Sequence, residues 1–181
     1  SQSTSDGAAG IIQYNCLDTS FEKYLNHDKR GLKQHNIGDL LPIKYILFGN
    51  CAIKTSLIQN VDGFNEKLTG YGGEEIELLD RIQQKHNLKV LKINAKLLRV
   101  NHPGFDSHCA RLIDFGSTNF KHLPFNIQQN IIPGSLIKLY MIVPTSLGYY
   151  ILCFIKDRLK LNCFILIRIL MGLSILRGYK R

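Results

Sequence analysis

The sequence predicts an α/β domain over residues 1–133, followed by an apolar and basic helical tail over residues 134–181. Short apolar runs bounded by glycine, proline or asparagine occur in the first part, and such runs are typical of strands. Ile76, Leu79 and Ile82 recur at a three-residue step, which is the spacing of one buried helix face. Together these patterns favour strands and helices in the first part and helices alone in the tail.

The expected strands are apolar runs that end at turn-forming residues. They lie at residues 10–14, 42–48, 88–93 and 96–100. Residues 1–10 are small and polar, and we expect them to lie outside the folded part.

The expected helices begin at capping residues or follow polar stretches. Residues 21–39 are polar and should form helix and loop. A short helix capped by Thr55 or Ser56 should run to Asn60. A longer helix should begin at Gly73-Glu74-Glu75 and end near residues 86–87.

The net charge of +9 is concentrated in the tail. From Gly134 onward, eight Lys and Arg residues face only Asp157, which accounts for seven of the nine net positive charges. A nucleic-acid groove would spread its basic residues over the fold, so this distribution argues against nucleic acid as a partner.

The cysteines indicate a reducing compartment. The chain has five of them, without a Cys-x-x-Cys pair or a zinc-binding spacing, so they are expected to act as small apolar residues. Residues 1–10 lack the basic start and apolar run of a signal peptide. We therefore expect a location on the cytoplasmic side.

The most informative stretch is the glycine-rich loop that precedes the longer helix. Glycines surround Tyr71, and Glu74 and Glu75 fall on the first helical turn. Two carboxylates there are ordinarily helix caps, which the helix dipole favours and whose pKa it tends to lower. An aromatic ring, exposed backbone at Gly72-Gly73 and paired carboxylates also suit a polyhydroxylated ligand.

At these residues the sequence resembles family 2 glycosyltransferases, including the galactosyltransferase-type C-terminal region. The resemblance is clearest over residues 47–102. It rests on Gly63-Phe64-Asn65-Glu66, on Gly70-Tyr71-Gly72-Gly73-Glu74-Glu75, on Glu77-Leu78 with Arg81, and on the upstream Phe48-Gly49-Asn50-Cys51-Ala52-Ile53-Lys54. One position departs from the family pattern, because Glu75 stands where the family has Asp.

The resemblance implies the C-terminal, acceptor-side half of a GT-A fold, the fold of nucleotide-diphospho-sugar transferases. It implies inverting transfer of a sugar from a nucleotide-diphosphate donor to a saccharide or lipid-linked acceptor, with Glu75 as the general base. The residues implied for acceptor binding are Asn50, Tyr71, Gly72, Gly73 and Glu74.

The resemblance also implies a divalent metal, Mn²⁺ or Mg²⁺, with His102 as a ligand. Imidazole and carboxylates are both competent ligands for such ions. A histidine at the end of a strand is equally typical of a hydrogen-bonded structural residue. His108 is a weaker second candidate.

The donor-side half expected of such an enzyme is not evident in the sequence. The chain has no Asp-x-Asp, the usual ligand of the metal and the sugar diphosphate, and no long strand–helix alternation precedes Leu47. We therefore expect a fragment or split-gene product that is inactive alone, with most metal ligands supplied from outside the chain. The alternative is a non-catalytic carbohydrate-binding or degenerate partner subunit at a membrane surface.

The tail contains two apolar runs that are shorter than a membrane span of about 20 residues. Residues 139–155 carry no charge, and residues 164–176 carry only Arg168. Basic residues beside apolar helices predict peripheral contact with a membrane surface. Burial against the domain's own sheet and a true span at residues 139–155 remain the alternatives.

Overall fold

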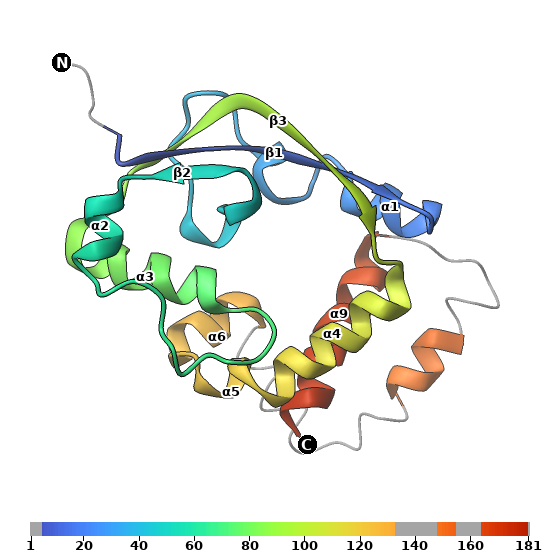
Figure 1. Cartoon of the computed structure of the whole chain (residues 1–181). Helices are drawn as coiled ribbons and strands as arrows, with labels where there is room; N and C mark the ends of the chain where they lie inside the picture. The colour runs from blue at the N-terminus through green and yellow to red at the C-terminus, as the bar shows by residue number, and fades with distance from the viewer. Residues whose placement is uncertain (1–4, 133–147, 155–163, 181) are drawn as a thin grey trace. The chain divides into compact units, whose positions relative to one another are not determined.

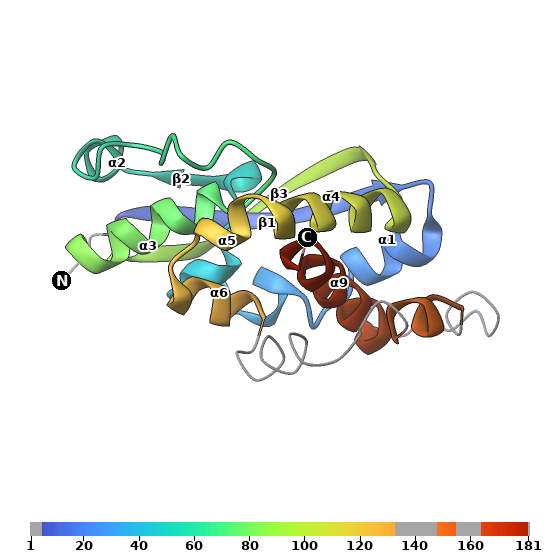
Figure 2. The same ribbon diagram turned by 90° about the horizontal axis from the view of Figure 1, so that it is seen from below.

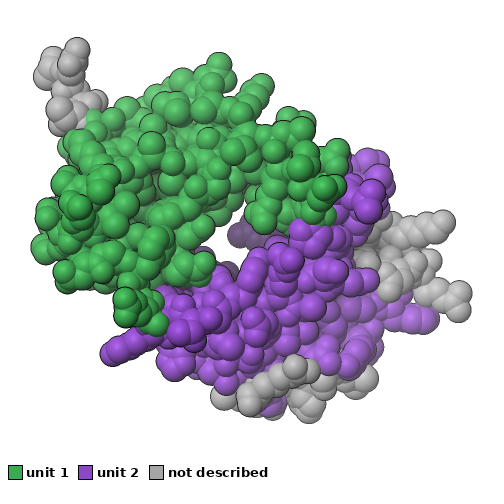
Figure 3. Space-filling model, viewed as in Figure 1, with its two compact units in different colours: residues 1–15, 25–66, 74–102 green, residues 16–24, 67–73, 103–181 purple. Residues whose placement is uncertain are grey.

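The computed structural model describes residues 5–132, 148–154 and 164–180. The chain divides into two compact units, which are coloured separately in Figure 3. Unit 1 comprises residues 1–15, 25–66 and 74–102, and unit 2 comprises residues 16–24, 67–73 and 103–181.

Unit 1 is built on a three-stranded sheet with the order β2-β1-β3 (Figure 1). Its strands are β1 (Gly7–Cys16), β2 (Cys51–Ile53) and β3 (Val90–His102). β1 and β2 are antiparallel, with Ala8 opposite Ala52. Asp6 contacts Lys89 and Gly10 faces Ala95, so β1 and β3 run in the same direction.

Helix α3 (Glu74–His86) supplies the core of unit 1. Leu78, Leu79 and Ile82 are fully buried and belong to one apolar cluster with Ala9 and Val90 of the sheet. Burying each leucine or isoleucine contributes about 1.5–3 kcal/mol. Of the predicted apolar step, Leu79 and Ile82 are buried as expected, whereas Ile76 is only half-buried.

The predicted strand at residues 42–48 is wrong. This segment forms two 3₁₀ turns, η2 (Ile43–Tyr45) and η3 (Phe48–Asn50). Pro42 lacks an N–H for a strand ladder, while its carbonyl accepts the Tyr45 N–H at 3.0 Å. Ile46 is nonetheless buried, so the turns bury the apolar run without a strand.

Other boundaries also differ from the sequence predictions. α2 (Thr55–Gln59) begins at Thr55, so its N-cap is Lys54, without a side-chain cap, and neither Thr55 nor Ser56 caps it. β3 is one continuous strand where two had been expected. β1 begins at Gly7, so part of residues 1–10 belongs to the sheet.

Apart from the loop at residues 67–73 and short connections, unit 2 is helical in its described parts. Its helices are α1 (Thr19–Leu25), α4 (Phe105–Ser117), α5 (Asn119–His122), α6 (Phe125–Ile131) and α9 (Phe164–Tyr179), and residues 148–154 are also helical. Asp18 accepts the main-chain N–H of Phe21 at 3.0 Å and that of Phe105 at 3.1 Å. One carboxylate thus satisfies a donor at the start of α1 and another at the start of α4.

Helices α4 and α9 lie side by side in both ribbon views (Figures 1 and 2). A Cβ on Gly116 would meet the Ile175 carbonyl, and one on Gly178 would meet the Ile113 carbonyl. Glycine at both positions therefore lets the two backbones approach closely. One face of α9 is therefore buried within the protein, but against helix α4 and not against the sheet, as the alternative had it.

The apolar tail was also considered as a membrane span. Among the described residues, no helix has both the length and the apolar character needed to cross a membrane. Of the run at 139–155, residues 139–147 and 155 lie outside the described part of the chain.

Candidate functional site

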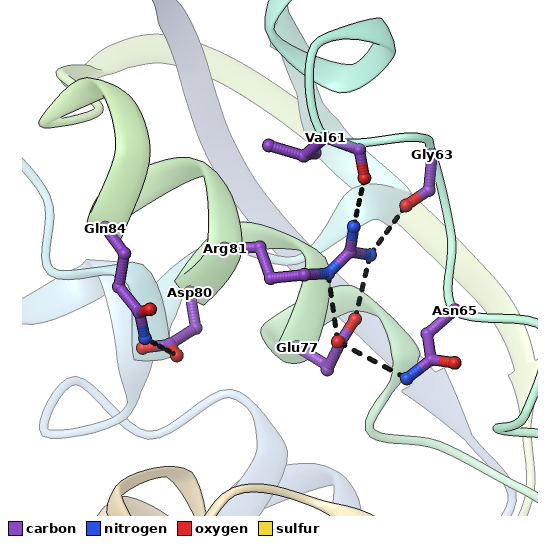
Figure 4. Close-up of polar contacts among 7 residues, drawn as sticks. All are labelled: Val61, Gly63, Asn65, Glu77, Asp80, Arg81 and Gln84. Carbon is purple, nitrogen blue, oxygen red and sulfur yellow. Dashed lines mark hydrogen bonds and ion pairs between the residues drawn. The ribbon is translucent and has the colours of Figure 1, made fainter.

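The turn before the glycine-rich loop is fixed by Arg81 of α3 (Figure 4). The guanidinium donates to the Gly63 carbonyl at 2.6 Å and also to the Val61 carbonyl. Asp62 and Gly63 both have positive φ, at 60° and 70°. The fork geometry of arginine thus holds a tight turn that the backbone would not adopt readily.

Glu77 completes this arrangement from the same helix. Its two carboxylate oxygens each accept a hydrogen bond from Arg81 at 2.9 Å, and the Asn65 amide donates to it at 3.4 Å. The carboxylate is almost fully buried. Glu77 and Arg81 are thus paired at i,i+4 on α3, and the pair fixes the Gly-Phe-Asn-Glu segment to the start of the helix.

The upstream motif segment reaches the same helix through Phe48. The ring of Phe48 packs edge-on against Phe64, with centroids 5.8 Å apart. The main-chain N–H of Phe48 donates to Oε2 of Glu75 at 3.3 Å. Two motif segments that are separated in the sequence therefore meet within unit 1, at the Glu75 carboxylate.

The electrostatic setting of Glu75 differs from the sequence prediction. Partial burial raises the pKa of this carboxyl above its usual value. The Phe48 N–H and the Arg99 charge oppose that rise, and the Glu74 charge reinforces it. The expected lowering of this pKa is therefore wrong, because desolvation by burial is the largest contribution. A raised pKa makes the carboxylate a stronger proton acceptor.

Cys51 lies in the field of the same carboxylate. Burial raises the pKa of its thiol, and the negative charge of Glu75 raises it further. A thiol that is harder to ionise is a poor nucleophile. The chemistry of this part of unit 1 is therefore that of the carboxylates.

Glu74 has an unsatisfied oxygen. Its Oε2 is buried and has no hydrogen-bond partner among the described residues. Leaving a buried acceptor unpaired costs about 1–3 kcal/mol. Such an atom suits a donor group, such as a ligand hydroxyl.

The Asn50 side chain links two strands of the sheet. Its amide nitrogen donates to the Ile11 carbonyl at 3.0 Å and to the Ala95 carbonyl at 3.4 Å, and so bridges β1 and β3. Gly10 leaves room for this side chain, because a Cβ there would lie 2.6 Å from the Asn50 amide nitrogen. The amide nitrogen thus has a structural role, and the Asn50 side-chain oxygen is the atom that could still contact a ligand.

The glycine-rich loop belongs to unit 2, where Asn119 holds it. The Asn119 side chain accepts the Gly70 N–H at 2.9 Å and donates to the carbonyls of Gly70 and Gly72, each at 2.8 Å. Asn119 is only 1% exposed, so these bonds are shielded from water. No sequence pattern pointed to this residue, because it lies 49 positions beyond Gly70 and belongs to no motif.

The glycines are required by the loop itself. Gly72 and Gly73 have φ of 73° and 91°, and a Cβ on Gly73 would lie 2.9 Å from the Phe115 ring. Close approach therefore comes from the protein's own Phe115. Tyr71 is exposed, with the Arg111 guanidinium 5.8 Å from its ring centre. The Tyr71 ring of the loop and the Arg111 charge of α4 are thus both presented to solvent.

His102, the predicted metal ligand, is buried at the end of β3. Its ring lies edge-on to Tyr14, with centroids 5.0 Å apart. His108, in unit 2, packs against Phe21 at 5.3 Å. Within the described residues, no group of three or more His, Cys, Asp or Glu could hold a metal ion. The residues present therefore do not form a metal site by themselves.

Comparison with known proteins supports the resemblance to glycosyltransferases over part of the chain. Residues 36–104 match the family model described as the N-terminal domain of galactosyltransferase. Neither the search of curated proteins nor the search of solved structures gave a match. The matched segment contains the Phe48–Glu75 contact and the Glu77–Arg81 pair. Residues 36–104 are therefore similar to a galactosyltransferase domain, and they lie within a small mixed α/β structure.

Proposed function

We propose that this chain takes part in inverting transfer of a sugar from a nucleotide-diphosphate donor to a hydroxyl of a saccharide or lipid-linked acceptor. The observation that carries the proposal is the Glu75 carboxylate. It is partly buried, is held by the Phe48 N–H at 3.3 Å, and has a raised pKa. It lies inside the galactosyltransferase-like region.

The proposed step makes Glu75 the general base. Its carboxylate takes the proton of the acceptor hydroxyl as that oxygen bonds to the anomeric carbon of the donor sugar. The bond from that carbon to the diphosphate breaks, and the nucleoside diphosphate leaves with the electron pair. Attack from the face opposite the leaving group inverts the anomeric configuration. A positioned general base contributes about 10²- to 10⁴-fold to such a rate.

Acceptor recognition is proposed separately for residues of unit 1 and for residues of unit 2. In unit 1, the unpaired Glu74 Oε2 would accept a hydrogen bond from an acceptor hydroxyl, and the Asn50 side-chain oxygen would add a second contact. In unit 2, the exposed Tyr71 ring would stack on a sugar. The positive φ values of Gly72 and Gly73 would set the path of the backbone that carries this ring.

We propose that His102 would hold a divalent ion, Mn²⁺ or Mg²⁺, together with ligands from outside the described residues. The charge of such an ion would neutralise a leaving diphosphate. The described residues offer no three-ligand group, and the 181 residues contain no Asp-x-Asp. The remaining ligands and the donor site are therefore proposed to come from outside this sequence.

A second candidate function is a carbohydrate-binding subunit without catalysis. Two sequence observations favour it, namely the absence of Asp-x-Asp and the Glu75 that replaces the family's Asp. The longer side chain displaces the carboxylate by about 1 Å unless the backbone compensates, and such a shift can cost on the order of 100-fold in rate. Against this candidate, the raised pKa of Glu75 is suited to proton transfer.

Both candidates require saccharide binding, which the purified chain should show. The test is saturation-transfer NMR with a panel of mono- and disaccharides. We expect transfer to at least one sugar, reduced by Tyr71→Ala and by Glu74→Gln. Lys67→Ala, a change to an exposed residue of the same loop, serves as the control. Absence of transfer to every sugar, or equal transfer in all variants, would contradict saccharide recognition.

A further inference from the structure

Two described helices of unit 2 present apolar side chains to solvent. Tyr150, Ile151 and Phe154 are exposed on the helix at residues 148–154, and Ile165 and Ile169 are exposed on α9. Large apolar side chains that are exposed together, in contrast to single exposed ones, are typical of an interaction surface.

The opposite faces of both helices are already occupied. On α9, Ile167, Leu170 and Ser174 are buried, one helical face away from Ile165 and Ile169. On the helix at 148–154, Tyr149 is hydrogen-bonded to Ser174.

Arg177 also joins the two helices. Its guanidinium donates to the Tyr150 hydroxyl at 2.7 Å. Tyr150 therefore takes part in the packing of the two helices, although its side chain is still exposed.

Their charge environment is strongly one-sided. The described part of the tail carries Arg168, Arg177 and Lys180 and has no Asp or Glu. Over residues 134–181 the sequence has eight Lys and Arg against one Asp157. The charge of the tail therefore favours a partner that is apolar and negatively charged.

A second copy of this chain does not meet that requirement. It would bring a net charge of +9 and the same basic tail. An anionic bilayer meets it, because each Lys or Arg near such a surface contributes about 1 kcal/mol and the apolar side chains enter the headgroup region. α9 has 16 residues, about 24 Å of helix, which is short of the roughly 30 Å hydrocarbon core.

We propose that these outward faces form a membrane-docking surface that binds the plane of an anionic lipid bilayer. The tail surface is defined as Tyr150, Ile151 and Phe154 together with Ile165, Arg168 and Ile169. The helices lie along the bilayer surface, with the isoleucines in the headgroup region and the cations against lipid phosphates. This inference goes beyond the transfer reaction and does not depend on it.

The test is co-sedimentation of the 181-residue chain with vesicles of phosphatidylcholine alone or mixed with phosphatidylglycerol. We expect binding to the mixed vesicles and weak binding to the neutral ones. Raising NaCl from about 0.1 M to about 0.5 M should release the chain, since screening shortens the reach of the cations. Equal binding to both vesicle types, or binding that salt does not weaken, would overturn the proposal.

The residues are tested with a matched pair of double variants. Ile165→Glu with Ile169→Glu alters the tail surface, at positions that are 69% and 47% exposed. Leu98→Glu with Val100→Glu makes the same charge change on β3, at positions that are 58% and 61% exposed. Each double variant should have the melting temperature of the wild type, since all four side chains are exposed.

We expect the first pair to weaken partitioning into anionic vesicles at least about tenfold more than the second. Equal weakening by both pairs would show that net charge alone drives binding, and would overturn the assignment to this surface. Light scattering that shows a dimer dispersed by the first pair would also overturn it, in favour of self-association.

Discussion

The Phe48 main-chain nitrogen lies 3.3 Å from Oε2 of Glu75 and donates a hydrogen bond to it. This contact joins the Phe-Gly-Asn segment to the first turn of α3. The same Phe48 ring packs on Phe64, whose neighbour Gly63 is held by Arg81. Glu75 is thereby positioned from two sides, by its own helix and by the turn at residues 48–50.

Glu75→Gln should stabilise the protein at neutral and alkaline pH. The pKa of Glu75 is raised in the folded state, so its contribution to stability is fully present below the unfolded pKa and is lost as the pH rises through the folded pKa. The neutral amide avoids that loss. The melting temperature of Glu75→Gln should therefore exceed that of the wild type at pH 8 and equal it at pH 4.

Glu66→Gln removes the same charge from an exposed position and provides the control. It should not reproduce the pH dependence. A melting-temperature difference that is the same at pH 4 and pH 8 for Glu75→Gln would contradict the partly desolvated carboxylate.

Arg81→Met should destabilise unit 1 by about 3 kcal/mol, because it leaves the buried Glu77 carboxylate and two carbonyls without their donor. Arg81→Lys should recover little of the lost stability, since an ammonium lacks the planar, forked donors of the guanidinium. Adding Glu77→Leu to Arg81→Met should recover part of the loss. Urea unfolding measures these variants and Glu77→Leu alone, and strictly additive effects of the two substitutions would argue against the pair.

Asn119→Asp should loosen the glycine-rich loop. The substitution is nearly isosteric, but it places a carboxylate oxygen against the carbonyls of Gly70 and Gly72. We expect a loss of about 2–4 kcal/mol from these unmet contacts. We also expect increased backbone amide exchange at residues 70–73, measured by hydrogen–deuterium exchange. Asn126→Asp, on α6, makes the same change elsewhere in unit 2 and should leave that exchange unchanged.

Gly178→Ala should destabilise the packing of α9 on α4, because its methyl group would meet the Ile113 carbonyl. Overpacking of this kind costs about 1–3 kcal/mol. Gly172→Ala lies in the same helix with no atom within 4 Å of the added Cβ, and should stabilise by about 0.5–1 kcal/mol. Thermal melts that rank the two variants in the opposite order would contradict the close helix contact.

The sequence predicted those parts of the fold that depend on local patterns. The apolar step of Ile76, Leu79 and Ile82 identified α3, and the apolar run at residues 10–14 identified β1, because both patterns follow directly from the period of the element. The run at residues 42–48 has the composition of a strand, yet Pro42 and local i→i+3 bonds turn it into η2 and η3. Composition alone does not distinguish a strand from a buried turn.

The candidate site shows the same limit. Glu77 and Arg81 are neighbours on one helix, so their pairing could be predicted. Asn119 acts on Gly70 from 49 positions away, and the Phe48 bond to Glu75 comes from the main chain. Neither leaves a signature in the side-chain pattern. The raised pKa of Glu75 likewise depends on burial, which appears only once the chain is folded.

Transfer kinetics distinguish a general base at Glu75 from a helix cap. The substitutions Glu75→Gln and Glu74→Gln are introduced separately into the gene in its natural host, with a deletion strain as the baseline. Sugar transfer from labelled nucleotide sugars is measured in extracts and normalised to the amount of the protein.

We predict that Glu75→Gln lowers kcat by about 10²- to 10⁴-fold. Glu74→Gln should mainly raise the acceptor KM, with a smaller change in kcat. If both residues were only helix caps, each change would cost at most about 1 kcal/mol of stability, with small and similar kinetic effects. Equal, mild effects at the two positions would contradict the assignment of Glu75 as the base.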